Sequence, residues 1–214
     1  MATASTPQSE IHDMALIGGG LVGLTLAIAL ARHGFEVLVV DIAPPETVLA
    51  KEFDGRSSAI AYAGYKLFDA IGLWPHLKDV AQPINEIRVS DGPSRLFVHF
   101  DHKELGDEPL GFMLENRHIR LALHEVAKDL PGLTLKAPCR ATSVERDDAF
   151  TQIALDDGTQ HKARLLIAAD GRGSRIRQDA GIGLAQWSYH QSGIVATVHH
   201  ERSHDGIAHE RFLP

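Results

Sequence analysis

The stretch that decides the fold runs from Ala15 to Asp41 and reads ALIGGGLVGLTLAIALARHGFEVLVVD. It begins with a short apolar run, passes through a glycine-rich turn and continues as an apolar helix that Gly34 ends. A second apolar run follows and closes with the acid. Strand, glycine turn, helix and second strand in this order predict one βαβ unit of an α/β fold.

Each glycine of the Gly-x-Gly-x-x-Gly pattern has a separate expected role. Gly18 permits the tight turn, Gly20 lets a pyrophosphate approach the backbone because it has no Cβ, and Gly23 lets the helix pack closely on the sheet. The helix N-terminus then presents free N–H groups and a positive dipole end to phosphates. Asp41 follows Gly23 by 18 positions, where an acid accepts a hydrogen bond from an adenosine ribose hydroxyl.

Three other interpretations fit the N-terminal sequence less well than a dinucleotide site does: an unrelated glycine-rich turn, a membrane span and a signal peptide. A glycine-rich turn also occurs in unrelated α/β proteins, but the two strands, the helix end and the acid favour the dinucleotide site. The uncharged run 14–30 has 17 residues, the lower limit for a membrane span, yet its four glycines favour strand, turn and helix. Residues 1–13 carry no basic segment, which opposes a signal peptide.

Composition limits the function classes. The 214 residues allow one large or two small domains, and 44% hydrophobic with 23% charged residues is typical of a globular protein. A net charge of −7 opposes non-specific binding to nucleic acid. Cys139 is the single cysteine, so no intrachain disulfide forms; this favours a reducing, cytoplasmic location and a bystander thiol.

The rest of the chain alternates predicted helices and strands. Ser57 and Ser58 are expected to cap a helix that Gly72 ends. Asp157 and Gly158 are expected to form a type I′ hairpin turn. Apolar patterning predicts the further elements, which are a short helical piece at 74–77, a β-hairpin of 87–90 and 96–100, a helix at 116–129, and strands at 133–136, 141–146, 150–155, 164–170 and 193–200.

A second motif, ARLLIAADGRGSRIR at 163–177, is an apolar strand that ends in Asp170 and Gly171. An acid at the carboxyl end of a strand stands where open α/β sheets place their ligand contacts. The alternative is the return strand of a hairpin with a solvated end. Together with the first motif, the acid is placed to reach a second part of the same cofactor.

With these motifs the chain resembles the class A flavoprotein aromatic monooxygenases built like para-hydroxybenzoate hydroxylase, and within them the ubiquinone-biosynthesis hydroxylases. The resemblance extends from residue 12 to the end of the sequence. It rests on Gly18–Gly23, Asp41, Asp54–Arg56, Glu115–Arg120, Asp170–Gly171 with Ser174 and Arg177, and Tyr189–Gln191.

The resemblance implies a set of cofactor-binding residues. The FAD pyrophosphate would bind at the glycine turn. The adenosine ribose would bind to Asp41, and the ribityl side of the flavin would bind to Asp170. Arg177 matches a position implicated in NAD(P)H docking. From composition alone, surface salt bridges explain Arg56 and Arg117 better than cofactor binding does, but the resemblance reverses this preference. The full set implied is Gly18, Gly20, Val22, Gly23, Asp41, Arg56, Asn116, Arg117, Asp170 and Gly171.

The resemblance also implies a fold and an activity. The fold is α/β, a discontinuous Rossmann-like FAD-binding domain at 13–83 and 113–183 with a flexible N-terminus at 1–12 and a partial β-rich substrate domain at 84–112 and 184–214. The activity is FAD- and NAD(P)H-dependent hydroxylation of a small phenol, a prenylated one of ubiquinone biosynthesis, through a flavin hydroperoxide. Implied associations are peripheral contact with the inner membrane and a ubiquinone-biosynthesis complex.

One family feature is missing from the sequence. The family's third motif, Gly-Asp followed by Ala-Ala-His, does not occur. The expectation is therefore an N-terminal part of a longer enzyme, which in isolation binds flavin weakly and does not turn over. The alternatives left open are another FAD oxidoreductase of the same fold, such as a prenyl reductase or halogenase, and an inactive flavin-binding fragment.

Histidines and serines suggest two further hypotheses. Of the 13 histidines, His199, His200, His204 and His209 gather near the end, but adjacent strand residues point to opposite faces and no metal-ligand spacing stands out. No metal site is predicted. Ser174 lacks a partnered histidine and acid in a nucleophile-elbow context, which opposes hydrolase chemistry.

Overall fold

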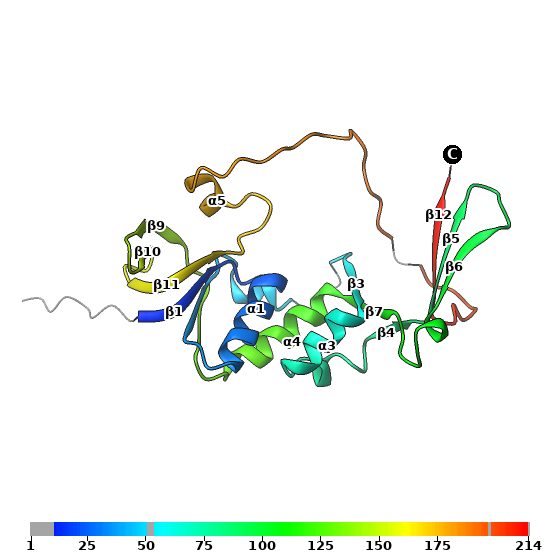
Figure 1. Cartoon of the computed structure of the whole chain (residues 1–214), viewed down its shortest axis with the longest axis horizontal. Helices are drawn as coiled ribbons and strands as arrows, with labels where there is room; N and C mark the ends of the chain where they lie inside the picture. The colour runs from blue at the N-terminus through cyan, green and yellow to red at the C-terminus, as the bar shows by residue number, and fades with distance from the viewer. Residues whose placement is uncertain (1–10, 51–53, 197, 214) are drawn as a thin grey trace, which may run out of the picture. The chain divides into compact units, whose positions relative to one another are not determined.

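The computed structural model of the chain describes residues 11–50, 54–196 and 198–213, and Figure 1 shows its elements. The chain divides into two compact units, which are described separately. The first comprises Met1–Ala50 and Leu123–Tyr189, and the second comprises Lys51–Ala122 and His190–Pro214. Compactness alone does not define a functional domain, so the predicted domain ranges stay a prediction.

A six-stranded mixed sheet forms the first unit. Its spatial order is β8-β2-β1-β11-β10-β9. Strands β8, β2, β1 and β11 are parallel to one another, whereas β10 is antiparallel to both β11 and β9. The strands are β1 (Ile11–Ile17), β2 (Val37–Val40), β8 (Leu133–Lys136), β9 (Ala141–Arg146), β10 (Thr151–Leu155) and β11 (Gln160–Ala168).

Helix α1 (Leu21–Arg32) connects β1 to the parallel strand β2. Its buried residues include Leu24, Ala27, Ile28 and Ala31, which are spaced at the helical period. All four residues of β2 are buried, as expected for a parallel strand covered on both faces. The predicted βαβ unit is therefore confirmed.

The remaining helices of this unit are short. They are α2 (Pro45–Val48) and α5 (Arg175–Asp179). Helix α4 (Asn116–Lys128) spans the boundary between the two units, and its buried residues Ile119 and Leu123 are one helical turn apart. The prediction of a helix at 116–129 is confirmed.

Two three-stranded sheets form most of the second unit. One has the order β3-β7-β4 and is antiparallel; the other has the order β12-β5-β6, in which β12 is parallel and β6 antiparallel to β5. Tyr65, Trp74 and Phe112 pack ring against ring, with centroids 4.6 to 5.2 Å apart. The elements are β3 (Ser57–Ala61), α3 (Tyr62–Ala70), η1 (Trp74–His76), β4 (Gln82–Ile84), β5 (Glu86–Asp91), β6 (Phe97–Asp101), η2 (His102–Glu104), β7 (Gly111–Glu115) and β12 (Ile207–Phe212).

The predicted cap at Ser57 and Ser58 is wrong. Both serines lie in β3, which pairs with β7 from Ser57 opposite Glu115 to Ala61 opposite Gly111. The helix begins only at Tyr62. Pairing with a strand more than 50 positions away overrides the local capping preference, a tertiary effect that local patterning does not report.

The strand predicted at 193–200 is also wrong within the described residues, since 193–196 and 198–200 have no regular structure. Thr197 lies outside the described residues. The β-branched run has no pairing partner there, and Ile194 is 93% exposed. The strand that does form is β12, which pairs with β5.

At Asp157 and Gly158 the predicted hairpin is confirmed, but its turn type is wrong. A type I′ turn needs positive φ at both central residues. Gly158 has φ +84°, whereas Asp157 is not among the residues with positive φ. The predicted hairpin at 87–100, the short helical piece at 74–76 and the strands β8, β9, β10 and β11 are confirmed. Residues 1–10 of the predicted flexible N-terminus lie outside the described residues, while 11–12 belong to β1.

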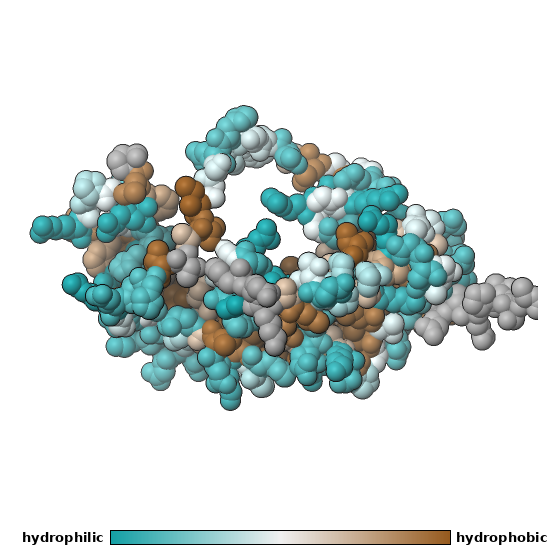
Figure 2. Space-filling view, turned by 180° about the vertical axis from the view of Figure 1, so that it is seen from behind, coloured by the Kyte–Doolittle hydropathy of each residue, from teal (hydrophilic) through white to brown (hydrophobic). Residues whose placement is uncertain are grey.

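Apolar side chains also reach the surface. On the face that Figure 2 shows, hydrophobic residues in brown lie among hydrophilic ones in teal. In the second unit, Phe97, Phe100 and Phe212 are each about half exposed or more. The predicted α/β fold class is confirmed, with parallel and antiparallel sheets together.

Candidate functional site

The turn between β1 and α1 requires glycine at two positions. Gly18 has φ +110°, and a Cβ built there would lie 2.3 Å from the carbonyl oxygen of Ala169. A Cβ on Gly23 would lie 1.9 Å from the carbonyl oxygen of Gly18. Both glycines are therefore demanded by the close approach of backbone to backbone.

Gly20 differs from these two glycines. It is the N-cap of α1 with extended backbone, φ −70° and ψ −170°, and a Cβ built there would meet no atom within 4 Å. Nothing in the described chain requires a glycine at this position. Helix α1 has neither a side-chain cap nor an acid in its first turn, and the first turn includes Val22, which is 77% exposed. Such a helix N-terminus suits an anionic group.

Asp41 follows the last residue of β2, and backbone groups orient its carboxylate. One oxygen accepts a hydrogen bond from the N–H of Gly19, and the other accepts from the N–H of Ala43 at 2.6 Å. Each carboxylate oxygen keeps a further acceptor position for a ligand hydroxyl. The hydrogen bond from Gly19 to Asp41 was not predicted from the sequence. Gly19 approaches Asp41 closely, since a Cβ on Gly19 would lie 3.1 Å from the Cβ of Asp41. The run of three consecutive glycines in the sequence was the signal for this close approach.

Asp170 comes two positions after the end of β11, next to the glycine turn. Its Oδ2 accepts hydrogen bonds from the N–H groups of Arg175 at 2.9 Å and Ile176 at 3.4 Å. Its Oδ1 is buried and has no hydrogen-bond partner among the described residues. A buried carboxylate oxygen left unpaired is costly, so a donor from a bound molecule would be favourable here.

These residues border one cavity of about 440 Å³, a size typical of small-molecule sites. The cavity lies at the carboxyl ends of β1, β2 and β11, where open α/β sheets bind ligands. Arg140 and Arg175 also border it and supply positive charge. Of the sequence-predicted residues, the cavity is lined by Gly18, Gly20, Asp41, Asp170 and Gly171, but not by Val22 or Gly23.

Cys139 borders the same cavity but is buried. Its Sγ–H donates to Oδ1 of Asp156 at 3.2 Å. Burial raises the pKa of the thiol, which disfavours the thiolate needed for nucleophilic chemistry. This agrees with the expectation of a bystander.

Three predicted cofactor residues belong to the second unit. The N–H of Asn116 donates to the carbonyl oxygen of Arg56 at 3.0 Å, and Oδ1 of Asn116 accepts from the hydroxyl of Ser58 at 2.7 Å. Arg117 donates through Nε to Glu115 at 2.5 Å. This ion pair is the kind of salt bridge that composition alone predicts for Arg117. A role of these three residues toward a cofactor stays a prediction.

An ion pair close by was missed in the sequence. Arg120 donates to Asp54 at 2.7 Å, and this hydrogen bond lowers the pKa of the Asp54 carboxyl. The two residues are 66 positions apart, so no local pattern reports the pair. It ties the start of α4 to the loop before β3.

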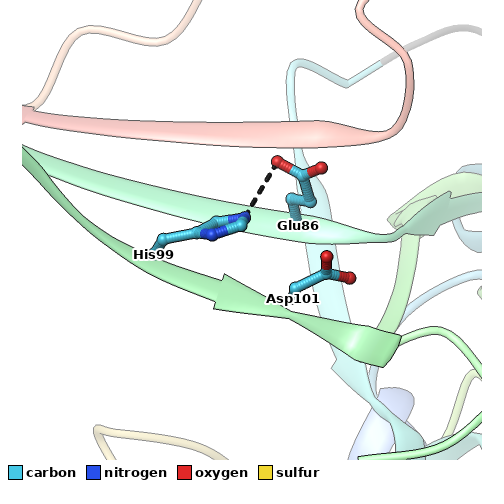
Figure 3. Close-up of side chains that lie close together, drawn as sticks. All are labelled: Glu86, His99 and Asp101. Carbon is cyan, nitrogen blue, oxygen red and sulfur yellow. Dashed lines mark hydrogen bonds and ion pairs between the residues drawn. The ribbon is translucent and has the colours of Figure 1, made fainter. Parts of the chain in front are cut away.

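A second missed cluster lies on the hairpin of β5 and β6, where Glu86, His99 and Asp101 point toward one another (Figure 3). Their possible ligand atoms lie within 4.8 Å of one another. Arg88 donates to Oε2 of Glu86 through Nε at 2.9 Å and Nη2 at 2.6 Å, and it lowers the pKa of Glu86. The hairpin register, with Glu86 opposite Asp101, is the signal that could have found the cluster.

A glycine turn, an acid after the second strand and a cavity at the carboxyl ends of a parallel sheet define a dinucleotide-binding fold. Residues 12–211 match the FAD binding domain family. Because this match covers most of the sequence, the chain belongs to that family.

Two curated relatives indicate the branch. The ubiquinone hydroxylase UbiL of Rhodospirillum rubrum is 49% identical over 205 residues, which cover 96% of this chain and 48% of that protein. The 3-demethoxyubiquinol 3-hydroxylase of Escherichia coli is 34% identical over 204 residues, which cover 94% of this chain and 52% of that protein. The chain thus spans about half the length of the curated relatives it matches.

Among solved structures, pqsL, a probable FAD-dependent monooxygenase from Pseudomonas aeruginosa, has the same fold. Its TM-score is 0.70 at 23% identity, covering 84% of this chain and 48% of that one. The resemblance to class A flavoprotein monooxygenases of the ubiquinone branch is confirmed. Within the described residues, no helix is both long and apolar enough to cross a bilayer. The expected cytoplasmic, membrane-peripheral location stays a prediction.

Proposed function

We propose that the protein encoded by this gene is an FAD-dependent hydroxylase, and that the first unit of this chain binds the adenosine and pyrophosphate part of the cofactor. One observation carries the proposal: five residues singled out from sequence line a single cavity at the carboxyl ends of parallel strands. The unpaired, buried Oδ1 of Asp170 supports it.

The cofactor, when bound, supplies redox and oxygen chemistry that amino-acid side chains do not provide. The chain's own residues bind and orient it. The N–H groups in the first turn of α1 hold the pyrophosphate beside Gly20, where no Cβ intervenes. Asp41, fixed by the Gly19 and Ala43 backbone, accepts a hydrogen bond from the adenosine ribose. Asp170 accepts one from the ribityl side.

The proposed reductant is NAD(P)H, with Arg177 as a docking residue. Arg177 donates through Nη1 to the carbonyl oxygen of Arg172 at 3.0 Å, while its Nε is buried and has no hydrogen-bond partner of its own among the described residues. A guanidinium held at one end suits the bidentate recognition of phosphate. A role of Arg56 and of Asn116 or Arg117 in binding FAD belongs to the same proposal.

The proposed substrate is a small phenol, a prenylated one of ubiquinone biosynthesis. The support is the 49% identity to a protein named as a ubiquinone hydroxylase. Association with a ubiquinone-biosynthesis complex or with the membrane surface belongs to the same proposal. The alternatives, a prenyl reductase or a halogenase of the same fold, would share the cofactor site and differ in product.

The test uses the complete gene product, purified with its bound flavin. We expect NAD(P)H oxidation and oxygen uptake that depend on a prenylated phenol, and a product one oxygen atom heavier by mass spectrometry. Bound flavin with a reduced or halogenated product would reject the hydroxylase proposal and keep the FAD site. A protein that binds no flavin would reject both.

A further inference from the structure

One face of the sheet β12-β5-β6 carries arginines and histidines toward one end and the acids Glu86 and Asp101 toward the other. Residues opposite one another in paired strands share a face. Arg88 lies opposite His99 on β6 and opposite His209 on β12. Two positions further along β5, Ser90 lies opposite Arg211. Strands far apart in the sequence therefore bring two arginines and two histidines together.

A hollow of about 370 Å³ lies over this face. Three arginines and a histidine border it, namely Arg88, Arg95, Arg211 and His209, and no carboxylate does. The whole chain has a net charge of −7, so this concentration of cations does not follow from composition.

The cations of the hollow differ in how they are held. Arg88 is fixed by two hydrogen bonds to Glu86 and lies 5.3 Å from the centre of the Phe97 ring. Among the described residues, no hydrogen bond or ion pair engages the side chains of Arg95, His209 or Arg211. One guanidinium is thus preoriented, and the guanidinium groups of Arg95 and Arg211 and the imidazole of His209 remain available to a ligand.

Like charges on neighbouring strands oppose sheet formation. Glu86 already offsets the charge of Arg88. Among the described residues no acid pairs with Arg95 or Arg211, so an anion would offset the charge of these two arginines, and arginine binds phosphate with paired N–H donors. Ser94 adds a hydroxyl donor, because its Oγ accepts from the N–H of Leu96 at 3.0 Å and its hydroxyl hydrogen has no acceptor among the residues that the structure describes. The geometry points to a binding site for a phosphate-bearing small molecule in this hollow, and this proposal is independent of the proposed hydroxylase function.

The neighbouring cluster of Glu86, His99 and Asp101 is better explained as support for this site than as a metal site. Oε2 of Glu86 already accepts two hydrogen bonds from Arg88 and contacts Nε2 of His99 at 3.1 Å (Figure 3). A metal ion at that oxygen would stand beside a guanidinium and be repelled by it. Glu86 therefore acts as the group that positions Arg88.

The test measures the binding of inorganic pyrophosphate and inorganic phosphate by calorimetry. The complete gene product is saturated with FAD, so that the dinucleotide cavity does not compete. We expect saturable binding that weakens about tenfold or more in Arg95→Gln and in Arg211→Gln, the size of one charge-assisted hydrogen bond. The control is Arg202→Gln, an exposed arginine of the same unit outside the hollow, which should stay within about twofold of the unchanged protein.

Thermal unfolding of each variant checks that the exposed substitutions leave the fold intact. Equal affinity in the Arg95, Arg211 and Arg202 variants would overturn the proposal, as would the lack of saturable binding. Acetate or benzoate that binds more tightly than phosphate would show a carboxylate site and reject the phosphate assignment.

Discussion

A glycine turn and the ends of parallel strands border the cavity of the first unit, whereas arginine side chains border the hollow of the second unit. In the first unit, Gly18 and the N-cap residue Gly20 border the cavity. In the second unit, Arg88 and Arg211 meet through the register of β5 with β12. A glycine turn can be recognised in a short stretch of sequence. A site made of side chains from several strands depends on pairing that occurs only in the folded chain.

The largest expected effect is a loss of stability on substitution of Gly18, which distinguishes it from Gly20 in the same turn. Gly18→Ala adds a Cβ that meets backbone atoms at 2.3 Å, at a residue with φ +110°. Steric overlap and backbone strain each cost about 1 to 3 kcal/mol, so the free energy of unfolding should fall by about 3 kcal/mol or more. Urea unfolding followed by circular dichroism measures it.

The matched variant is Gly20→Ala, whose Cβ meets nothing within 4 Å. Its free energy of unfolding should stay within about 1 kcal/mol of the unchanged protein. If both variants lose the same stability, the distinction between a packing glycine and a cavity glycine fails.

A smaller effect is expected at Asp41, whose carboxylate accepts a hydrogen bond from the N–H of Gly19 in the same turn. Asp41→Ala removes an acceptor for the ribose hydroxyl, which is worth about 1.5 to 3 kcal/mol as a hydrogen bond to a charged group. FAD affinity should fall by about tenfold to about a hundredfold, measured by flavin fluorescence on titration. Asp148→Ala, at an exposed acid of the same unit, should bind FAD like the unchanged protein.

The next effect depends on pH. Nε2 of His124 is buried without a hydrogen-bond partner among the described residues, and burial lowers the pKa of His124 below 6.5 while Asp41 opposes this. The unfolded chain therefore takes up a proton more readily than the folded chain just below pH 6.5. Stability should be lost as the pH falls from 6.5 toward the lowered pKa.

Unfolding temperatures measured from about pH 8 to about pH 5 check this. His124→Gln should flatten the fall below pH 6.5, whereas His33→Gln, at an exposed histidine of the same unit, should leave it as it is. A fall of the same steepness in both variants would assign the pH dependence to other groups.

The smallest effect is expected at the surface of the second unit. The Arg117 side chain is about a quarter exposed and pairs with Glu115. Exposed ion pairs contribute about 0.2 to 1 kcal/mol, so Arg117→Gln should change the free energy of unfolding by less than about 1 kcal/mol in urea. A loss of FAD affinity in the same variant would support the cofactor role; unchanged affinity would leave the ion pair as the explanation of this arginine.

The contrast between the units also explains what could be predicted from sequence. The βαβ unit and the position of Asp41 and Asp170 after the ends of strands could be predicted because local sequence patterns fix them; the roles of the two acids toward a cofactor stay predictions. Ser57 and Ser58 were misassigned because β3 forms only by pairing with β7. The cluster of Glu86, His99 and Asp101 and the hollow at Arg211 were missed because they require the register of β5 with β6 and β12.

The most direct test of the account is the flavin content of Gly20→Val in the complete gene product. Gly20 has extended backbone that valine adopts, and open space beside it. We predict a protein that unfolds within about 4 °C of the unchanged one, measured with both freed of flavin, because the loss of an N-cap glycine costs about 1 kcal/mol or less, but that purifies without bound flavin. A Gly20→Val protein that purifies with as much FAD per chain as the unchanged protein would contradict the account.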